Sequence, residues 1–96
     1  MGVEYVEDKY VDFGEKIHLR CVIRPKCEQD IPFSIRSARW ELYNPMGVLE
    51  AEGECEINGH ELDAMVQPQS TGRYKFKYIY EVADEIWVNQ VKLRVN

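Results

Sequence analysis

Residues 70–76, STGRYKF, decide the fold of this chain. Three turn formers come first, and the run from Arg73 to Glu81 that follows alternates apolar with charged side chains over most of its length. A period of two indicates a β-strand with one buried face. Tyr74 stands two residues after the turn formers, where its hydroxyl can hydrogen-bond back to the preceding turn as a tyrosine corner. The stretch therefore predicts a core strand whose start is pinned by Tyr74.

The other segments of the chain alternate in the same way, and none shows a helical period. Asn58-Gly59 between two alternating runs is a strong hairpin signal, because both residues accept a positive φ. Asn44-Pro45-Met46-Gly47 is a second turn signal. The expected strands cover residues 3–13 with a kink near 7–9, 15–24, 35–43, the two halves of 48–66, 73–81 and the run after a turn at 82–85. This pattern predicts an all-β domain of about seven strands.

The turns also predict strand registers. A loop at Asn58-Gly59 pairs Ile57 with His60, Glu56 with Glu61, Cys55 with Leu62 and Glu54 with Asp63. A loop over 82–85 pairs Tyr80 with Trp87, Tyr78 with Asn89, Phe76 with Val91 and Tyr74 with Leu93. The second register places eight side chains on one face of the sheet without a bulge.

Nearly the whole chain resembles an immunoglobulin-like β-sandwich. Tyr74 corresponds to the start of that family's F strand, residues 14–21 (GEKIHLRC) resemble its B strand with the first core cysteine at Cys21, and Trp40 corresponds to its C-strand tryptophan. Phe76 stands where the family has its second core cysteine. The resemblance therefore implies one sandwich domain over residues 1–96, with Cys21 buried and no inter-sheet disulfide.

Length and composition exclude several classes of protein. The chain has 96 residues, enough for one domain, and its net charge of −5 argues against a nucleic-acid partner. No stretch approaches the ~20 apolar residues of a membrane span, and no secretory leader pattern is visible. Three cysteines are an odd number, which favours free thiols over a paired secreted scaffold, although a Cys27–Cys55 bridge stays open. We expect a cytoplasmic or virion location rather than secretion.

Four carboxylates share one outer face in the predicted hairpin register, where like charges directly opposite are unfavourable: Glu54, Glu56, Glu61 and Asp63. One interpretation is a divalent-cation site. The other, which we favour, is neutralisation by His18, Arg20 and Arg24 on the neighbouring strand, because strand faces rarely converge enough oxygen ligands on one ion.

The sequence contains no catalytic constellation. His18 and Cys21 are three residues apart on one strand and therefore point to opposite faces. No cysteine and histidine spacing matches a zinc site. We expect no enzymatic activity, no metal or other cofactor, and no small-molecule ligand.

An outward apolar patch is the one suggestive feature for binding. The predicted registers place Ile35, Ile79, Ile86 and Val88 together on an outer face, where they are a candidate protein contact or reflect only the preference of β-branched residues for strands. Charge is also uneven, since cations collect on that face (Arg39, Lys75, Lys77, Lys92 and Arg94) and acids around residues 50–63. That asymmetry suits head-to-tail self-association or is ordinary surface mixing.

These features predict a non-catalytic module that binds a protein partner or a second copy of itself. The pattern of Trp40-x-Leu42, Gly47, Asn58-Gly59 and Gly72-x-Tyr74 is also loosely similar to small structural proteins of phages and prophages, which implies a virion component. The alternative is an immunoglobulin-like module of a bacterial surface or secreted protein that binds carbohydrate or a host protein. The fold alone does not choose between them.

Overall fold

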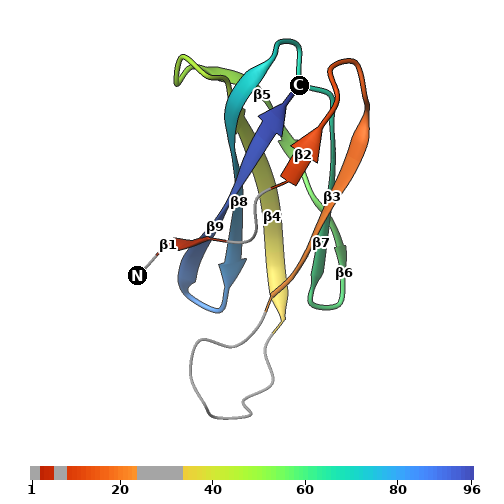
Figure 1. Cartoon of the computed structure of the whole chain (residues 1–96). Helices are drawn as coiled ribbons and strands as arrows, with labels where there is room; N and C mark the ends of the chain where they lie inside the picture. Colours follow the sequence, from red (N-terminus) through yellow and green to blue (C-terminus); the bar gives the residue numbers. More distant parts are fainter. Residues whose placement is uncertain (1–2, 6–8, 24–33) are drawn as a thin grey trace.

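Two β-sheets make up the domain (Figure 1). The computed structural model describes residues 3–5, 9–23 and 34–96. Its strands are β1 (Val3–Tyr5), β2 (Lys9–Val11), β3 (Ile17–Val22), β4 (Ile35–Tyr43), β5 (Leu49–Glu54), β6 (Glu56–Asn58), β7 (Glu61–Val66), β8 (Gly72–Val82) and β9 (Glu85–Val95). The larger sheet has the order β1-β9-β8-β4-β5, with β2 also paired to β9, and the smaller sheet has the order β3-β7-β6.

The first predicted strand, residues 3–13, is found as β1 and β2, which both run parallel to β9. The kink expected near residues 7–9 falls largely on residues 6–8, outside the described residues. Backbone hydrogen bonds then fasten the end of β2 to the C-terminus, since Phe13 N donates to Asn96 O at 2.8 Å and Asn96 N donates to Val11 O at 2.9 Å. The two strands therefore close one edge of the larger sheet.

The β8–β9 hairpin forms the centre of the larger sheet, and its predicted register is confirmed. Tyr80 pairs with Trp87, Tyr78 with Asn89, Phe76 with Val91 and Tyr74 with Leu93. All eight side chains are buried. The loop is shorter than the predicted residues 82–85, because Val82 pairs with Glu85 and only Ala83 and Asp84 remain unpaired, but the register is the same.

The tyrosine corner is also present. The Tyr74 hydroxyl accepts a hydrogen bond from Ser70 N at 3.1 Å, lies 2.9 Å from Ser70 Oγ and donates to Glu50 Oε1 at 2.7 Å. Tyr74 is 1 % exposed, so without these bonds its hydroxyl would be buried with no hydrogen-bond partner.

The predicted single hairpin over residues 48–66 is wrong, because β5, the larger part of its first half, belongs to the larger sheet. β5 pairs with β4, with Trp40 opposite Gly53 and Arg39 opposite Glu54, and the chain changes sheets at Cys55. Gly53 makes room for the indole of Trp40, since a Cβ atom there would lie 3.0 Å from Trp40 Nε1. Pairing with β5 also covers the edge of β4 that would otherwise be open.

The β6–β7 register is shifted from the prediction. Glu56 pairs with Asp63, Ile57 with Leu62 and Asn58 with Glu61, so the loop is Gly59-His60 rather than Asn58-Gly59. Gly59 has a φ of 63°, which suits the first loop position of a type II′ turn. The shift places Ile57 opposite the fully buried Leu62 instead of opposite His60. Pairing two apolar side chains therefore outweighs the turn preference of Asn-Gly.

The core lies between the two sheets. Leu19 and Cys21 of β3 point into it as predicted, and Phe76 stacks on the half-buried Trp40 with ring centroids 5.7 Å apart. Cys21 is buried and is not part of a disulfide, as the resemblance implied, and neither is Cys55; Cys27 lies outside the described residues. The buried Asn89 joins the sheets, since it accepts from the Tyr80 hydroxyl at 3.0 Å and donates to Cys21 Sγ at 3.6 Å.

Candidate interaction face

The outward side chains of β4, β8 and β9 form one broad surface, which we call the outer face. The cross-strand rows of the larger sheet give its layout: Glu81 with Ile86, Arg39 with Ile79 and Val88, Glu41 with Lys77 and Gln90, Tyr43 with Lys75 and Lys92, and Arg73 with Arg94 and Tyr10. The rows run from the β8–β9 turn to the end of the sheet that holds the C-terminus (Figure 1). Apolar side chains lie at the first end of this face and cations at the second.

Three residues of the predicted patch lie together on the outer face, and we call them the apolar group: Ile79, Ile86 and Val88. Ile79 is directly opposite Val88, as the predicted register requires. Both are half-buried, whereas Ile86 is 55 % exposed. The arrangement is therefore a small apolar surface whose most accessible member is Ile86.

Ile35, the fourth member of the predicted patch, is not on the outer face. It is only 8 % exposed and belongs to the core, where it pairs with Val82. A bulge between Ile35 and Ser37 inserts one residue into β4 and reverses the direction in which Ile35 points. The exposed Arg36 occupies the extra position, 4.0 Å from Glu81. Burying an isoleucine and leaving an arginine in water explains why the bulge is favourable.

Ordered polar groups border the apolar group. Glu41 is central among them, because it accepts hydrogen bonds from the Tyr43 hydroxyl at 2.7 Å and from Arg39 Nη1 at 2.6 Å. The hydrogen bond from Tyr43 is the larger cause and that from Arg39 the second, and both lower the pKa of Glu41. Lys77 extends the network with its ammonium 5.0 Å from the centre of the Tyr43 ring. An apolar centre with a polar border is the usual anatomy of a protein interface.

One acid of the β6–β7 hairpin, Asp63, is neutralised from within the smaller sheet. Asp63 Oδ1 lies 2.9 Å from His18 Nδ1, and Asp63 Oδ2 accepts from Arg20 Nε at 3.1 Å. The hydrogen bond to His18 and then that to Arg20 lower the pKa of Asp63. Glu54 lies opposite Arg39 in the β4–β5 register, and not opposite Asp63. The neutralising interpretation holds for Asp63 and its two partners, while Arg24 lies outside the described residues.

Two further observations concern the described residues alone. They contain no group of three or more His, Cys, Asp or Glu side chains arranged to hold a metal ion. They also contain no helix long and apolar enough to cross a bilayer.

Comparison with known proteins identifies the fold but not a family. No protein-family model and no curated protein matches the chain. Among solved structures, it is similar to the M1 domain from titin, with a TM-score of 0.52 at 13 % sequence identity over 97 % of this chain and 91 % of that domain. The chain has an immunoglobulin-like β-sandwich fold. This likeness confirms the predicted fold class and says nothing more specific about function.

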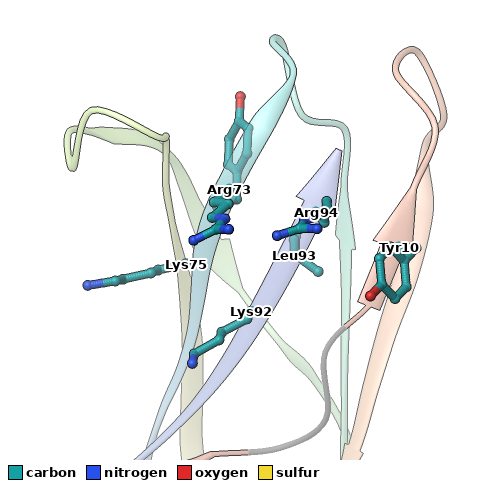
Figure 2. A pocket seen from close by; sticks show the side chains of 7 residues that line it. Tyr10, Arg73, Lys75, Lys92, Leu93 and Arg94 are labelled. Atoms are coloured by element: carbon teal, nitrogen blue, oxygen red, sulfur yellow. The ribbon is translucent and has the colours of Figure 1, made fainter. Parts of the chain in front are cut away.

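One feature of the outer face was not predicted from the sequence. A hollow of about 410 Å³ lies at the end where the cations collect, and its side chains rise from β2, β8 and β9 (Figure 2). It is lined by Tyr10, Arg73, Tyr74, Lys75, Lys92, Leu93 and Arg94. The predicted β8–β9 register already implied that Arg73 faces Arg94 and that Lys75 faces Lys92. The position of Tyr10 beside them depends on the pairing of β2 with β9.

Proposed function

We propose that this domain is a non-catalytic binding or assembly module that contacts protein through the apolar group. The observation that carries the proposal is the exposure of Ile86 next to the Ile79–Val88 pair, within a border of ordered polar side chains. Burying apolar surface contributes ~25 cal/mol per Å², so even a small apolar group can anchor a contact. A partner that covers Ile86 leaves the bordering ion pairs in water, so binding carries little desolvation penalty for those charges.

The finer form of the proposal is an assembly part of a phage or prophage virion, located in the cytoplasm or the virion. It is supported by the pattern similarity around Trp40, Asn58-Gly59 and Gly72-x-Tyr74 and by the uneven distribution of charge. The exposed Glu56 of β6 belongs to the smaller sheet, whereas the basic end of the outer face belongs to the larger sheet. This asymmetry favours a second copy of the chain as the first partner to test.

Ile86→Lys tests the proposal. Sedimentation measured from micromolar to millimolar protein should show mass that rises with concentration for the wild type and a monomer for Ile86→Lys, because the lysine places an unpaired charge in the contact. The melting temperature should stay within a few degrees of the wild type, since the side chain is already exposed.

Val22→Lys is the matched control. Val22 is a β-branched residue 58 % exposed on the smaller sheet, close to the 55 % of Ile86, and its replacement should leave self-association unchanged. A wild type that stays monomeric throughout would rule out assembly by self-association. Loss of association in both variants would show that the contact is not specific to the outer face.

A further inference from the structure

Four cations surround the hollow on the outer face. Arg73 lies directly opposite Arg94, and Lys75 directly opposite Lys92, on neighbouring antiparallel strands. Figure 2 shows their side chains extending from β8 and β9, with the ring of Tyr10 standing beside Arg94. Tyr10 is 71 % exposed. The hollow therefore combines two rows of positive charge with one aromatic flank.

This arrangement is unfavourable for the free domain. Like charges directly opposite each other destabilise a sheet, and here Arg73 lies directly opposite Arg94. Among the residues that the structure describes, Arg73, Lys75 and Arg94 form no ion pair, whereas Arg36 and Arg39 of the same sheet have carboxylate partners. The chain as a whole carries a net charge of −5. A local excess of cations in an acidic protein concentrates anions at that point of its surface.

We propose that this hollow binds a small ligand with two oxyanion groups, of the kind that phosphate or sulfate esters of a sugar provide. Each cationic row can hold one group, and the rows are separated by two residues along the strands, which is about 7 Å. The planar guanidinium groups of Arg73 and Arg94 suit bidentate bonding to a tetrahedral oxyanion, and the lysines add point charges. This site goes beyond the proposed protein-binding function and departs from the sequence-based expectation of no small-molecule ligand.

The dimensions of the hollow favour a compact ligand. Its volume of about 410 Å³ lies within the ~300–1,000 Å³ usual for small-molecule sites. The exposed ring of Tyr10 offers an apolar surface to the scaffold that carries the anionic groups. A long polyanion that continued along the outer face would reach the row beyond Lys75 and Lys92, where Glu41 and its β5 neighbour Glu52 outnumber the single cation Lys77. Charge on the neighbouring surface therefore limits the ligand to the hollow.

Calorimetric titration of the 96-residue chain tests the proposal with four probes: a hexose bisphosphate, a disulfated disaccharide, a hexose monophosphate and a single-stranded oligonucleotide. At least one of the first two should bind about ten-fold more tightly than the monophosphate, and its binding should weaken as salt increases. The tighter of those two identifies phosphate or sulfate as the natural group. A bound probe should also raise the melting temperature, because it binds only the folded state.

The variant Arg73→Gln/Arg94→Gln should weaken binding of the preferred probe by about ten-fold or more, since charge-assisted hydrogen bonds are lost. Without ligand its melting temperature should equal or exceed that of the wild type, because repulsion is relieved, so weaker binding is not a folding defect. Lys77→Gln removes one charge from the same strand and face outside the hollow and should change affinity by less than about three-fold.

Three outcomes would overturn the proposal. The first is no binding of either doubly anionic probe at millimolar concentration. The second is tighter binding of the oligonucleotide than of both, which would assign the hollow to a polyanion. The third is an equal loss of affinity in Lys77→Gln and in Arg73→Gln/Arg94→Gln, which would mean that only overall charge matters. None of these results depends on self-association through Ile86, so this proposal and the proposed function fail separately.

Discussion

The hydroxyl of Tyr74 shows how a single residue fixes the geometry of a turn. Its contacts to Ser70 hold the residues before β8 against that strand, and its bond to Glu50 reaches β5 at the far edge of the sheet. Glu50 also accepts from Gln69 N at 3.2 Å, so the same carboxylate binds both the turn and Tyr74. Burial is the main cause that raises the pKa of Tyr74. One phenol thus connects a turn, a core strand and an edge strand.

Tyr74→Phe should lower the free energy of unfolding by about 1–3 kcal/mol, because Glu50 and the Ser70 N–H lose a partner in a partly buried site while the ring still packs. Urea unfolding followed by tryptophan fluorescence measures the change. Tyr10→Phe removes an exposed hydroxyl and is the control, with an expected change within about 0.5 kcal/mol. Equal stability of Tyr74→Phe and the wild type would mean that water replaces the hydrogen bonds of the Tyr74 hydroxyl with no loss of folding free energy.

At the level of secondary-structure elements, the β8–β9 hairpin forms the centre of the larger sheet, although its loop contains a residue with a strained backbone. Ala83, the first residue of its two-residue loop, has a φ of 53°. Left-handed backbone costs an L-residue roughly 1–2 kcal/mol, which the eleven-residue pairing of β8 with β9 easily tolerates. The hairpin is therefore set by its long ladder and buried aromatic residues rather than by its turn.

Ala83→Gly should raise the free energy of unfolding by up to about 1 kcal/mol, because glycine removes the left-handed strain at the cost of a more flexible unfolded chain. Urea unfolding again gives the value. Ala51→Gly is the matched change on β5, where φ is negative, and should lower stability by about 0.5–1 kcal/mol. A destabilised Ala83→Gly would show that the loop conformation carries no strain.

For the whole molecule, the crossing between the sheets leaves one titratable thiol partly buried against the core. Cys55 is the residue at which the chain leaves β5 and enters β6. Burial, with smaller contributions from the charges of Asp63 and Cys21, raises the pKa of Cys55 to about 12. Burial likewise raises the pKa of Tyr78 strongly. At alkaline pH the folded state therefore keeps both groups neutral over a range in which they ionise in the unfolded chain.

The stability that Cys55 contributes is therefore complete below the ordinary thiol pKa and is lost as pH rises from there toward about 12. Melting temperatures measured in steps from neutral pH upward should fall more steeply for the wild type than for Cys55→Ala. The difference should open between about pH 9 and pH 10, before tyrosines ionise in the unfolded chain. Parallel curves for the two proteins would contradict a partly buried thiol that stays neutral at the crossing.

The sequence by itself determined the features that rest on local chemistry. Alternation determined which side chains of β8 and β9 face inward, and the short turn after β8 determined their register, so the Ile79–Val88 pair and the exposed Ile86 were predictable. The turn before Tyr74 predicted the tyrosine corner in the same way. Each of these depends on residues that are close along the chain or joined by a two-residue loop.

Only the tertiary structure decided which strands become neighbours. Alternation has a period of two, so the β6–β7 register can shift by two residues without changing any face, and burial of Ile57 against Leu62 chose between the two registers. The pairing of β5 with β4 depends on an open edge and on the space that Gly53 leaves for Trp40, and the bulge that buries Ile35 depends on the core beneath it. The basic hollow gains Tyr10 only because β2 lies beside β9. These contacts join residues distant in sequence, and the free energy that selects them comes from the packed whole rather than from any local pattern.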